Sequence, residues 1–197
     1  RLASLPARGS DFRLPNEADA SIDAGYQFDW IDGGGLDIAV LSFAQVDAAG
    51  NVNVGRFGSR APGVGGFVNI AQGARRVVFV GTFATGHDPY QIGEGRILVP
   101  PTGQAKFVDK VEQISFAAAT AVVEGKPVRY VTERAVFELT SDGPVLTEVA
   151  PGVDPQADVV ARMGFTPRIS ESLRVMDAEI FHDQLMRLTL RKSGVTK

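Results

Sequence analysis

Short apolar segments alternate with glycine- and proline-rich stretches along most of this chain. Ile38–Phe43 and Val77–Val80 are apolar and rich in residues that favour β-structure, which is typical of strands buried on both faces. Three further apolar segments, "PVRYVT", "AVFELT" and "PVLTEVA", follow one another, and the turn sequence "SDGP" (Ser141–Pro144) separates the last two. The pattern therefore predicts two buried strands early in the chain and three consecutive strands later, two of them joined as a hairpin.

Helical spacing occurs between these predicted strands. Phe67, Ile70 and Ala71 recur at the spacing of about two turns of helix within residues 65–73. The segment "AAATAVVEGK" favours a helix by composition and ends at Gly125, a residue type suited to the end of a helix. This mixture predicts an α/β fold with an open, mostly parallel sheet, flanking helices and an added β-hairpin region.

Three further segments complete the predicted secondary structure. Residues 84–105 are rich in Gly and Pro and predict an irregular hairpin or loop. Residues 106–116 alternate loosely between apolar and polar side chains, which predicts a strand. The segment "DPQADVVARMG" predicts a short helix, with Asp154 as its N-cap, Pro155 at its first position and Gly164 at its end.

The chain divides into three parts. Residues 1–24 are polar and rich in turn-forming residues, and they predict an extended lead-in. Residues 25–175 contain the predicted strands and most of the predicted helices, and they form one α/β domain. Residues 176–197 show helical spacing at Ile180, Leu185 and Leu188 and predict a helical tail that docks on the domain or on a partner.

Composition narrows the function classes. Of 197 residues, 44% are apolar and 22% are charged, which is close to the average of soluble globular proteins. The net charge is −3 and no basic stripe is present, so a nucleic-acid-binding surface is not expected. The absence of cysteine excludes disulfides, thiolate metal sites and cysteine nucleophiles. Together with the absence of an apolar run of roughly 18 residues, this composition predicts a cytoplasmic protein that does not span a membrane.

Glycine is concentrated in four places, Asp32–Asp37, Ala48–Val54, Gly63–Phe67 and Gly81–Asp88. Glycine allows a ligand to approach the backbone, and exposed N–H groups suit an anion; the alternative interpretation is that these glycines only form turns. Neither a G-x-G-x-x-G motif between a strand and a helix nor a Gly-Lys-Ser/Thr sequence is present. A dinucleotide site or a P-loop is therefore not predicted.

Few residues offer other catalytic chemistry. The two histidines, His87 and His182, are far apart in the sequence, and no G-x-S-x-G motif is present, so neither a Ser-His-Asp triad nor a metal site is predicted. The role of His87, in a predicted loop, stays open. Glu133 and Arg134 lie at a joint between two predicted strands, and we interpret them as an ion pair at a bend, with a role in a site as the alternative.

Four segments in this order and spacing resemble a known family: "DGGGLDIAVLSFAQVDAAGNVNV", "GVGGFVNIAQGARRVVFVGTF", "YVTERAVFEL" and "VLTEVAPGVD". From about Leu5 to Phe181, the chain is similar to the C-terminal, β-type half of family I coenzyme A transferases, in the acetate/propionate and 3-oxoacid CoA-transferase group. The resemblance implies a ping-pong reaction in which a glutamate attacks an acyl-CoA thioester and becomes a glutamyl-CoA thioester, which a second carboxylic acid then attacks. It also implies coenzyme A as a substrate and no tightly bound cofactor or metal.

The resemblance assigns site residues one by one. It implies that the backbone N–H of Gly65 or Gly66 donates to the oxyanion, and that the side-chain amide of Asn53 contacts the thioester oxygen. The residues that it places against coenzyme A are Gly33, Gly34, Gly35, Gly63 and Phe67. An oxyanion donor of this kind is typically worth roughly 3–4 kcal/mol to the transition state.

The chain departs from the family pattern at the nucleophile. Relatives have a Glu-(Ser/Ala/Asn)-Gly segment followed by paired glycines, an aliphatic residue and proline. Here Leu5 and Pro6 match the last two positions, and Ala3 and Ser4 replace the paired glycines. The nucleophilic glutamate is therefore expected just upstream of Arg1, or the protein lacks it.

The resemblance implies partners as well as chemistry. It implies an N-terminal, α-type half on the same or another chain, a homo- or hetero-oligomer, and an acyl-CoA with a short-chain carboxylic acid as substrates. Two alternatives stay open: an inert CoA-binding or scaffolding subunit, and an acyl-CoA hydrolase that uses water as acceptor on the same scaffold.

Overall fold

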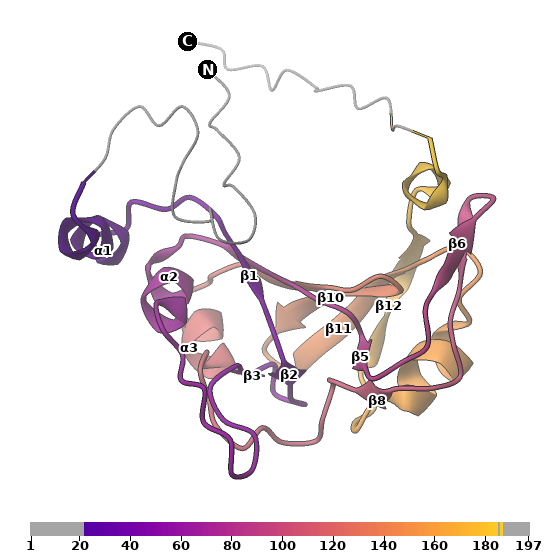
Figure 1. Cartoon of the computed structure of the whole chain (residues 1–197), viewed down its shortest axis with the longest axis horizontal. Coiled ribbons are helices and arrows are strands. Elements are labelled where there is room, and N and C mark those ends of the chain that lie inside the picture. The colour runs from indigo at the N-terminus through magenta and orange to yellow at the C-terminus, as the bar shows by residue number, and fades with distance from the viewer. Residues whose placement is uncertain (1–21, 185, 187–197) are drawn as a thin grey trace.

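The computed structural model describes residues 22–184 and residue 186, which form a six-stranded main sheet, three two-stranded sheets and flanking helices (Figure 1). The helices are α1 (Ala24–Asp32), α2 (Phe67–Gly73) and α3 (Ala118–Val123). The strands of the main sheet are β1 (Ala39–Ser42), β4 (Val77–Val80), β9 (Val128–Val131), β10 (Ala135–Thr140), β11 (Gly143–Val149) and β12 (Arg168–Val175). The shorter elements are β2 (Gln45–Val46), β3 (Val52–Asn53), β5 (Ala84–Thr85), β6 (Gln91–Gly93), β7 (Arg96–Leu98), β8 (Gln104–Ala105) and the helical turns η2 (Pro155–Val159), η3 (Val160–Arg162) and η4 (Ala178–Phe181).

The main sheet has six strands in the order β1-β4-β9-β10-β11-β12. Strands β1, β4 and β9 are parallel to one another, β10 is antiparallel to both of its neighbours, and β12 is parallel to β11. The predicted α/β class with a mostly parallel sheet is therefore confirmed. The predicted strands of this sheet and the hairpin at "SDGP" are also confirmed, whereas β12 was not predicted.

One face of the sheet carries the core. Phe79 of β4 is completely buried, and its ring packs against three other aromatic rings with centroid distances between 5.1 and 5.7 Å, those of Phe67, Phe116 and Tyr130. Phe67 comes from α2 and Phe116 from the segment before α3, so both helices lie on this face. Burial of aromatic side chains on this scale supplies a large part of the hydrophobic stabilisation of a domain of this size.

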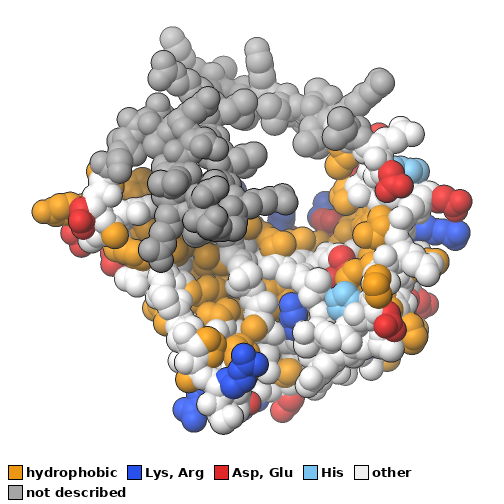
Figure 2. Space-filling model, viewed as in Figure 1, with side chains coloured by type: hydrophobic (Ala, Val, Ile, Leu, Met, Phe, Trp, Pro, Cys, Tyr) orange, Lys and Arg blue, Asp and Glu red, His pale blue; other side chains and the backbone are white. Residues whose placement is uncertain are grey.

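The opposite face of the sheet is apolar but only partly covered. Register places Val40 beside Val78, and Val80 beside Val131, on the face away from the aromatic core. Val40 is 64% exposed and Val80 is 42% exposed. Figure 2 shows hydrophobic side chains at the surface in the middle of the molecule, where the sheet lies in Figure 1. Exposed apolar surface on a sheet interior is typical of an interaction surface.

The strand predicted over residues 106–116 is wrong. This segment makes only isolated bridges at its ends, Phe107 with Val46 and Phe116 with Val52. Because its backbone bonds first to β2 and then to β3, which are antiparallel partners of each other, it crosses this hairpin and forms no continuous ladder.

The helix predicted after Asp154 is confirmed at its start but not at its end. The Asp154 carboxylate accepts from two backbone N–H groups of the first turn, at 2.8 and 2.7 Å, and the helical turns end at Arg162. Gly164 is not the helix cap. A Cβ on Gly164 would lie 2.8 Å from the backbone nitrogen of Asp109, so glycine is needed there for close backbone approach.

Both terminal parts of the predicted division lie partly outside the described residues. Most of the lead-in is outside them, and so are Leu185 and the part of the tail after Met186, which includes Leu188. Helix α1 was not predicted, and it begins at Ala24, within the part assigned to the lead-in. The division into parts therefore stays a prediction. No helix among residues 22–184 has the length and apolar character needed to cross a membrane.

Candidate active site

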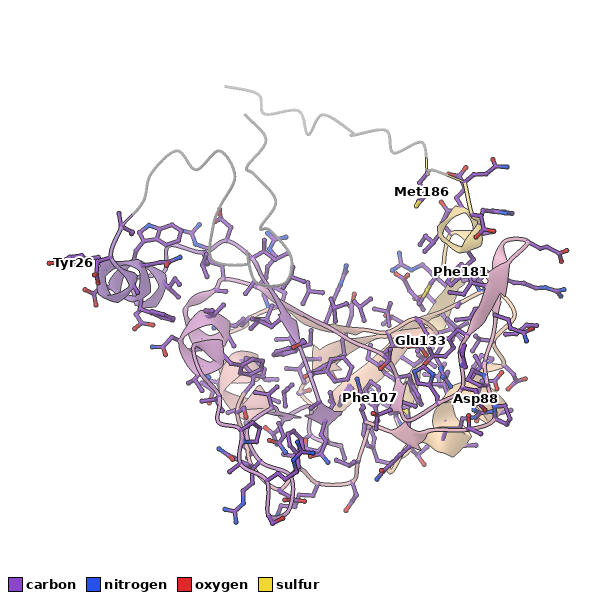
Figure 3. The ribbon with its side chains drawn as sticks, in the orientation of Figure 1. Tyr26, Asp88, Phe107, Glu133, Phe181 and Met186 are labelled. Carbon is purple, nitrogen blue, oxygen red and sulfur yellow. The ribbon has the colours of Figure 1, made fainter. Side chains whose placement is uncertain are left out.

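The carboxyl ends of the parallel strands β1, β4 and β9 meet at one edge of the sheet. Ligands of open α/β sheets bind outside this edge. The β2–β3 hairpin follows β1, Gly81–Phe83 follows β4, and Thr132–Arg134 follows β9. Figure 3 shows Glu133 toward the middle of the molecule, whereas Tyr26 of α1 points outward.

The glycine loop before α2 also lies at this edge, because α2 leads back to the start of β4. Gly63 and Gly65 have φ values of +84° and +53°, which side chains other than glycine rarely adopt. A Cβ on either residue would meet nothing within 4 Å, so backbone conformation alone requires glycine. At Gly66 a Cβ would lie 2.7 Å from the ring of Phe28 on α1, so close packing requires glycine there. Within residues 22–184, the N–H groups of Gly65 and Gly66 have no hydrogen-bond acceptor.

Asn53 holds the turn that contacts the start of this loop. Its side chain is completely buried, and its Nδ2 donates to Gln45 Oε1 at 2.8 Å and to the carbonyl of Arg56 at 2.6 Å. Its Oδ1 accepts from the N–H groups of Gly55 and Arg56 at 3.0 and 3.2 Å, and the carbonyl of Gly55 in turn accepts from Gly63 at 3.3 Å. Because both amide hydrogens are donated within the chain, a contact from this amide to a thioester oxygen requires one of these bonds to break.

The other residues expected against coenzyme A do not all lie at this edge. The N–H groups of Gly33, Gly34 and Gly35 donate to carbonyls of α1, so these glycines form the end of that helix. The next residue, Leu36, accepts from Arg75 just before β4, which places the glycines at the amino edge of the sheet.

The structure therefore brings Asn53, Gly63, Gly65 and Gly66 together and leaves the triple glycine at the opposite edge. The fifth of the residues expected against coenzyme A, Phe67, is buried with its ring stacked on Phe79. Contact of coenzyme A with these residues stays a prediction.

The ion pair predicted at the bend is confirmed. Arg134 Nε donates to Glu133 Oε1 at 2.6 Å, and the Arg134 side chain is only 1% exposed. Its guanidinium lies over the ring of Phe83 at 4.7 Å and donates to the hydroxyl of Tyr90 and the backbone carbonyl of Asp158, both at 3.3 Å. A buried guanidinium that is stacked and hydrogen-bonded in this way is strongly oriented.

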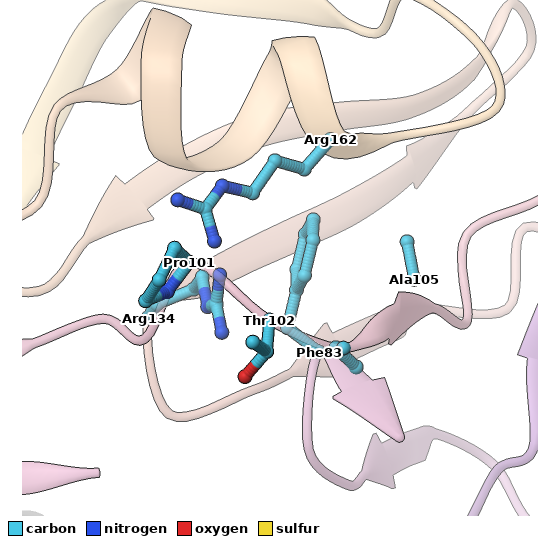
Figure 4. Close-up of a pocket in the computed structure, with 8 residues that line it drawn as sticks. Phe83, Pro101, Thr102, Ala105, Arg134 and Arg162 are labelled. Atoms are coloured by element: carbon cyan, nitrogen blue, oxygen red, sulfur yellow. The ribbon is translucent and has the colours of Figure 1, made fainter. Parts of the chain in front are cut away.

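This arginine also lines a pocket of about 230 Å³, which the sequence did not indicate. Figure 4 shows Arg134 and Arg162 approaching the pocket from different segments, with the Phe83 ring beside them. Arg162 was missed because it reaches the pocket from a helical turn distant in sequence. The one local indication of a site here was the adjacent pair Glu133 and Arg134, for which a role in a site was the alternative interpretation.

Burial shifts the pKa values of two side chains close to Glu133, Tyr90 and Lys106. It raises the pKa of Tyr90 to about 12, so the phenol keeps its proton to a higher pH than an exposed tyrosine does. Burial also lowers the pKa of Lys106, an effect that the negative charge of Glu133 opposes, and its ammonium donates to Thr82 Oγ1 at 2.9 Å. His87 Nδ1 lies 2.7 Å from the carbonyl oxygen of Asp88, and its ring packs 4.3 Å from that of Tyr90.

Comparison with known proteins agrees with this architecture. The chain is 42% identical over 188 residues to caffeate CoA-transferase of Acetobacterium woodii, covering 92% of this chain and 35% of that protein. It is 40% identical over 194 residues to acetate CoA-transferase YdiF of Escherichia coli O157:H7, covering 98% and 36%. The crystal structure of the YdiF apoenzyme superposes with a TM-score of 0.86 at 41% identity, over 89% of this chain and 34% of that one. These matches confirm the resemblance to family I coenzyme A transferases.

The part of these proteins that the chain resembles is the β-type half. A more distant relative is one subunit of the 3-oxoadipate CoA-transferase from Pseudomonas knackmussii, 27% identical over 180 residues, covering 86% of this chain and 65% of that subunit. No protein-family model matches the chain. The chain spans about a third of the length of the first two CoA-transferases, 35% and 36%.

Proposed function

We propose that this chain is the C-terminal half of a CoA-transferase that moves coenzyme A between a short-chain acyl-CoA and a carboxylic acid. The observation that carries the proposal is 40–42% identity to named CoA-transferases over 92–98% of the chain. A solved complex of YdiF is described as a thioester with coenzyme A, which is the kind of intermediate that the proposal requires. Here the reacting glutamate would lie just upstream of Arg1.

The proposed chemistry uses the glycine loop. Attack on a thioester or an anhydride builds negative charge on a carbonyl oxygen, and donors fixed at that point lower the barrier by roughly 3–4 kcal/mol each. The N–H groups of Gly65 and Gly66 are adjacent and donate to no backbone acceptor in residues 22–184, and they are the donors that we propose. Asn53 then acts through the turn that it holds, because the carbonyl of Gly55 fixes Gly63 at the start of the loop.

We further propose that the remainder of the protein covers the exposed sheet face around Val40 and Val80. About two thirds of the length of the first relatives lies outside the match. An apolar sheet face without its covering layer is a poor surface in water, whereas α/β sheets of this type are covered on both faces. The covering layer would be an α-type half or the segment that carries the glutamate. Such an assembly would work in the cytoplasm.

The test is CoA transfer by the full-length protein. Acetyl-CoA and isotope-labelled propionate are mixed with enzyme, and propionyl-CoA, acetate and free CoA are measured together. A transferase forms propionyl-CoA in step with acetate and releases little free CoA, whereas a hydrolase releases free CoA regardless of propionate. If neither product forms with any short-chain acid, the proposal fails and an inert CoA-binding subunit is the remaining alternative.

A further inference from the structure

The charged residues that line the pocket beside Arg134 are all basic. Among the residues that line it, the two charged ones are Arg134 and Arg162. The carboxylates that pair with them, Glu133 and Asp158, are not among the lining residues: Arg134 Nε donates to Glu133 Oε1, and Asp158 Oδ1 lies 3.4 Å from Arg162 Nη2. The hollow itself is therefore lined by cations and not by anions.

Both guanidinium groups keep N–H donors that no group in residues 22–184 accepts. An arginine has five N–H donors. Within residues 22–184, Arg134 donates through three of them, to Glu133, Asp158 and Tyr90, and Arg162 through two, to the carbonyl of Pro100 and to Asp158. The remaining donors of two forked groups match the oxygen spacing of a carboxylate or a phosphate.

The walls of the pocket are held in place without a ligand. Thr102 Oγ1 accepts from the N–H of Asp88 at 3.0 Å and donates to the Asp88 carboxylate at 2.8 Å. Gly103 has a φ of +108°, and a Cβ there would lie 2.8 Å from the Cβ of His87, so only glycine allows the wall to approach so closely. Strands β5 and β8 pair directly beside these residues. A preformed site of this kind loses little conformational entropy on binding.

We propose that this pocket binds a small oxyanion, a carboxylate or a phosphate group, between Arg162 and Arg134. Arg134 forms the buried side of the site and is fixed by the stacked Phe83 ring, while Arg162, with 30% of its side chain exposed, is the arginine that an entering anion meets. The volume of about 230 Å³ holds a short-chain carboxylate or a phosphate with a few waters. The source of the anion, an acid substrate or a phosphate of coenzyme A, rests on the proposed function, but the binding itself does not.

Direct binding tests the site. Inorganic phosphate and propionate are titrated separately into the full-length protein by calorimetry, and the parent is compared with Arg162→Gln, Arg162→Lys and Arg168→Gln. Arg168 is the matched control, because it is a surface arginine of β12 paired with Asp142 at 3.2 Å. We expect Arg162→Gln to weaken binding of at least one anion by roughly tenfold or more, the cost of a lost charge-assisted hydrogen bond. Arg162→Lys should restore part of the affinity, and Arg168→Gln should leave it unchanged.

Two results would overturn the site: no binding of either anion by the folded parent protein, or equal binding by the parent and the folded Arg162→Gln variant. The kinetics of the transfer reaction then identify which anion the site binds. If Arg162→Gln raises the KM for the acid alone, the site binds the acid substrate. If it raises the KM for acyl-CoA alone, the site binds a phosphate of coenzyme A. If the protein binds an anion but catalyses no transfer, the proposed function is refuted and the anion site stands. If it catalyses transfer but binds neither anion, the anion site is refuted and the proposed function stands.

Discussion

Asn53 makes four hydrogen bonds with its side chain, and all of them stay within the chain. A buried amide with every group satisfied is typical of a residue that holds a turn. The resemblance to CoA-transferases assigned this amide to the substrate, and its surroundings favour a role in positioning the loop of Gly63–Gly66. The two roles predict different behaviour on substitution.

Replacing Asn53 by Ala leaves the N–H groups of Gly55 and Arg56 without their acceptor. We expect a loss of about 1–3 kcal/mol in the free energy of unfolding, the cost of unsatisfied buried groups. Displacement of the glycine loop should lower kcat by roughly tenfold to a hundredfold. Gln45→Ala, which removes only one of the four hydrogen bonds, serves as control and should have the smaller effect on both. Unchanged stability with a lowered kcat would instead show that the amide acts on the thioester.

Tyr90 gives a pH prediction. Burial raises its pKa to about 12 from the ordinary 10.0, so the folded protein holds this proton more tightly than the unfolded chain does. The resulting stabilisation is fully present below pH 10 and is lost as the pH rises toward 12. Tyr90→Phe should therefore reduce the fall in unfolding free energy above pH 10, measured by urea denaturation. The fall should not vanish, because burial also raises the pKa of Tyr130. An identical pH dependence in parent and variant would contradict this.

At the scale of elements, strands with strong local patterns could be predicted and exposed or irregular elements could not. β4 is a run of four apolar residues with no alternative interpretation, whereas β12 reads "RISESLRV" and buries none of its side chains completely. Helix α1 buries only Ile31, so its hydrophobic pattern was too weak, although Asp23 is a capping residue. The strand predicted over residues 106–116 was wrong because this segment bonds first to β2 and then to β3. Which strands a segment contacts depends on the tertiary structure and leaves no local pattern.

The candidate site, too, could be predicted only in part from the sequence. The glycine loop and the ion pair of Glu133 with Arg134 are contiguous in sequence and could be predicted. The pocket also needs Arg162 and Thr102, which only the folded chain brings to the same place. Whether a glycine supports a ligand or ends a helix was likewise undecided by the sequence: Gly33–Gly35 end α1.

The β10–β11 turn offers a test of an element. Gly143 has a φ of +96°, and a Cβ there would lie 2.3 Å from the carbonyl oxygen of Ala48. Gly143→Ala should lower the free energy of unfolding by roughly 2–4 kcal/mol, because strain adds to a backbone clash. The control is Gly58→Ala, also at positive φ but with nothing within 4 Å, which should cost about 1–2 kcal/mol. Equal losses would mean that the turn does not pack against Ala48 as described.

At the scale of the whole molecule, the exposed sheet face predicts how the protein assembles. Val80→Lys puts a charge into the middle of this face and should prevent the rest of the protein from packing there, because a buried unpaired charge is costly. Val123→Lys is the control, since Val123 on α3 is 89% exposed outside this face. Size-exclusion chromatography and proteolysis of the full-length protein should show loosening only for the first variant. Equal behaviour of the two variants would exclude the sheet face as the interface.

The central claim is that this chain forms one side of a site where coenzyme A becomes attached to a glutamate. The most direct test is the intact mass of the full-length protein after incubation with acetyl-CoA alone, followed by borohydride reduction and peptide mapping. The account predicts a covalent CoA adduct that disappears when propionate is added, and a reduced glutamate in the segment just before Arg1. Release of free CoA with no adduct and no modified glutamate would contradict it.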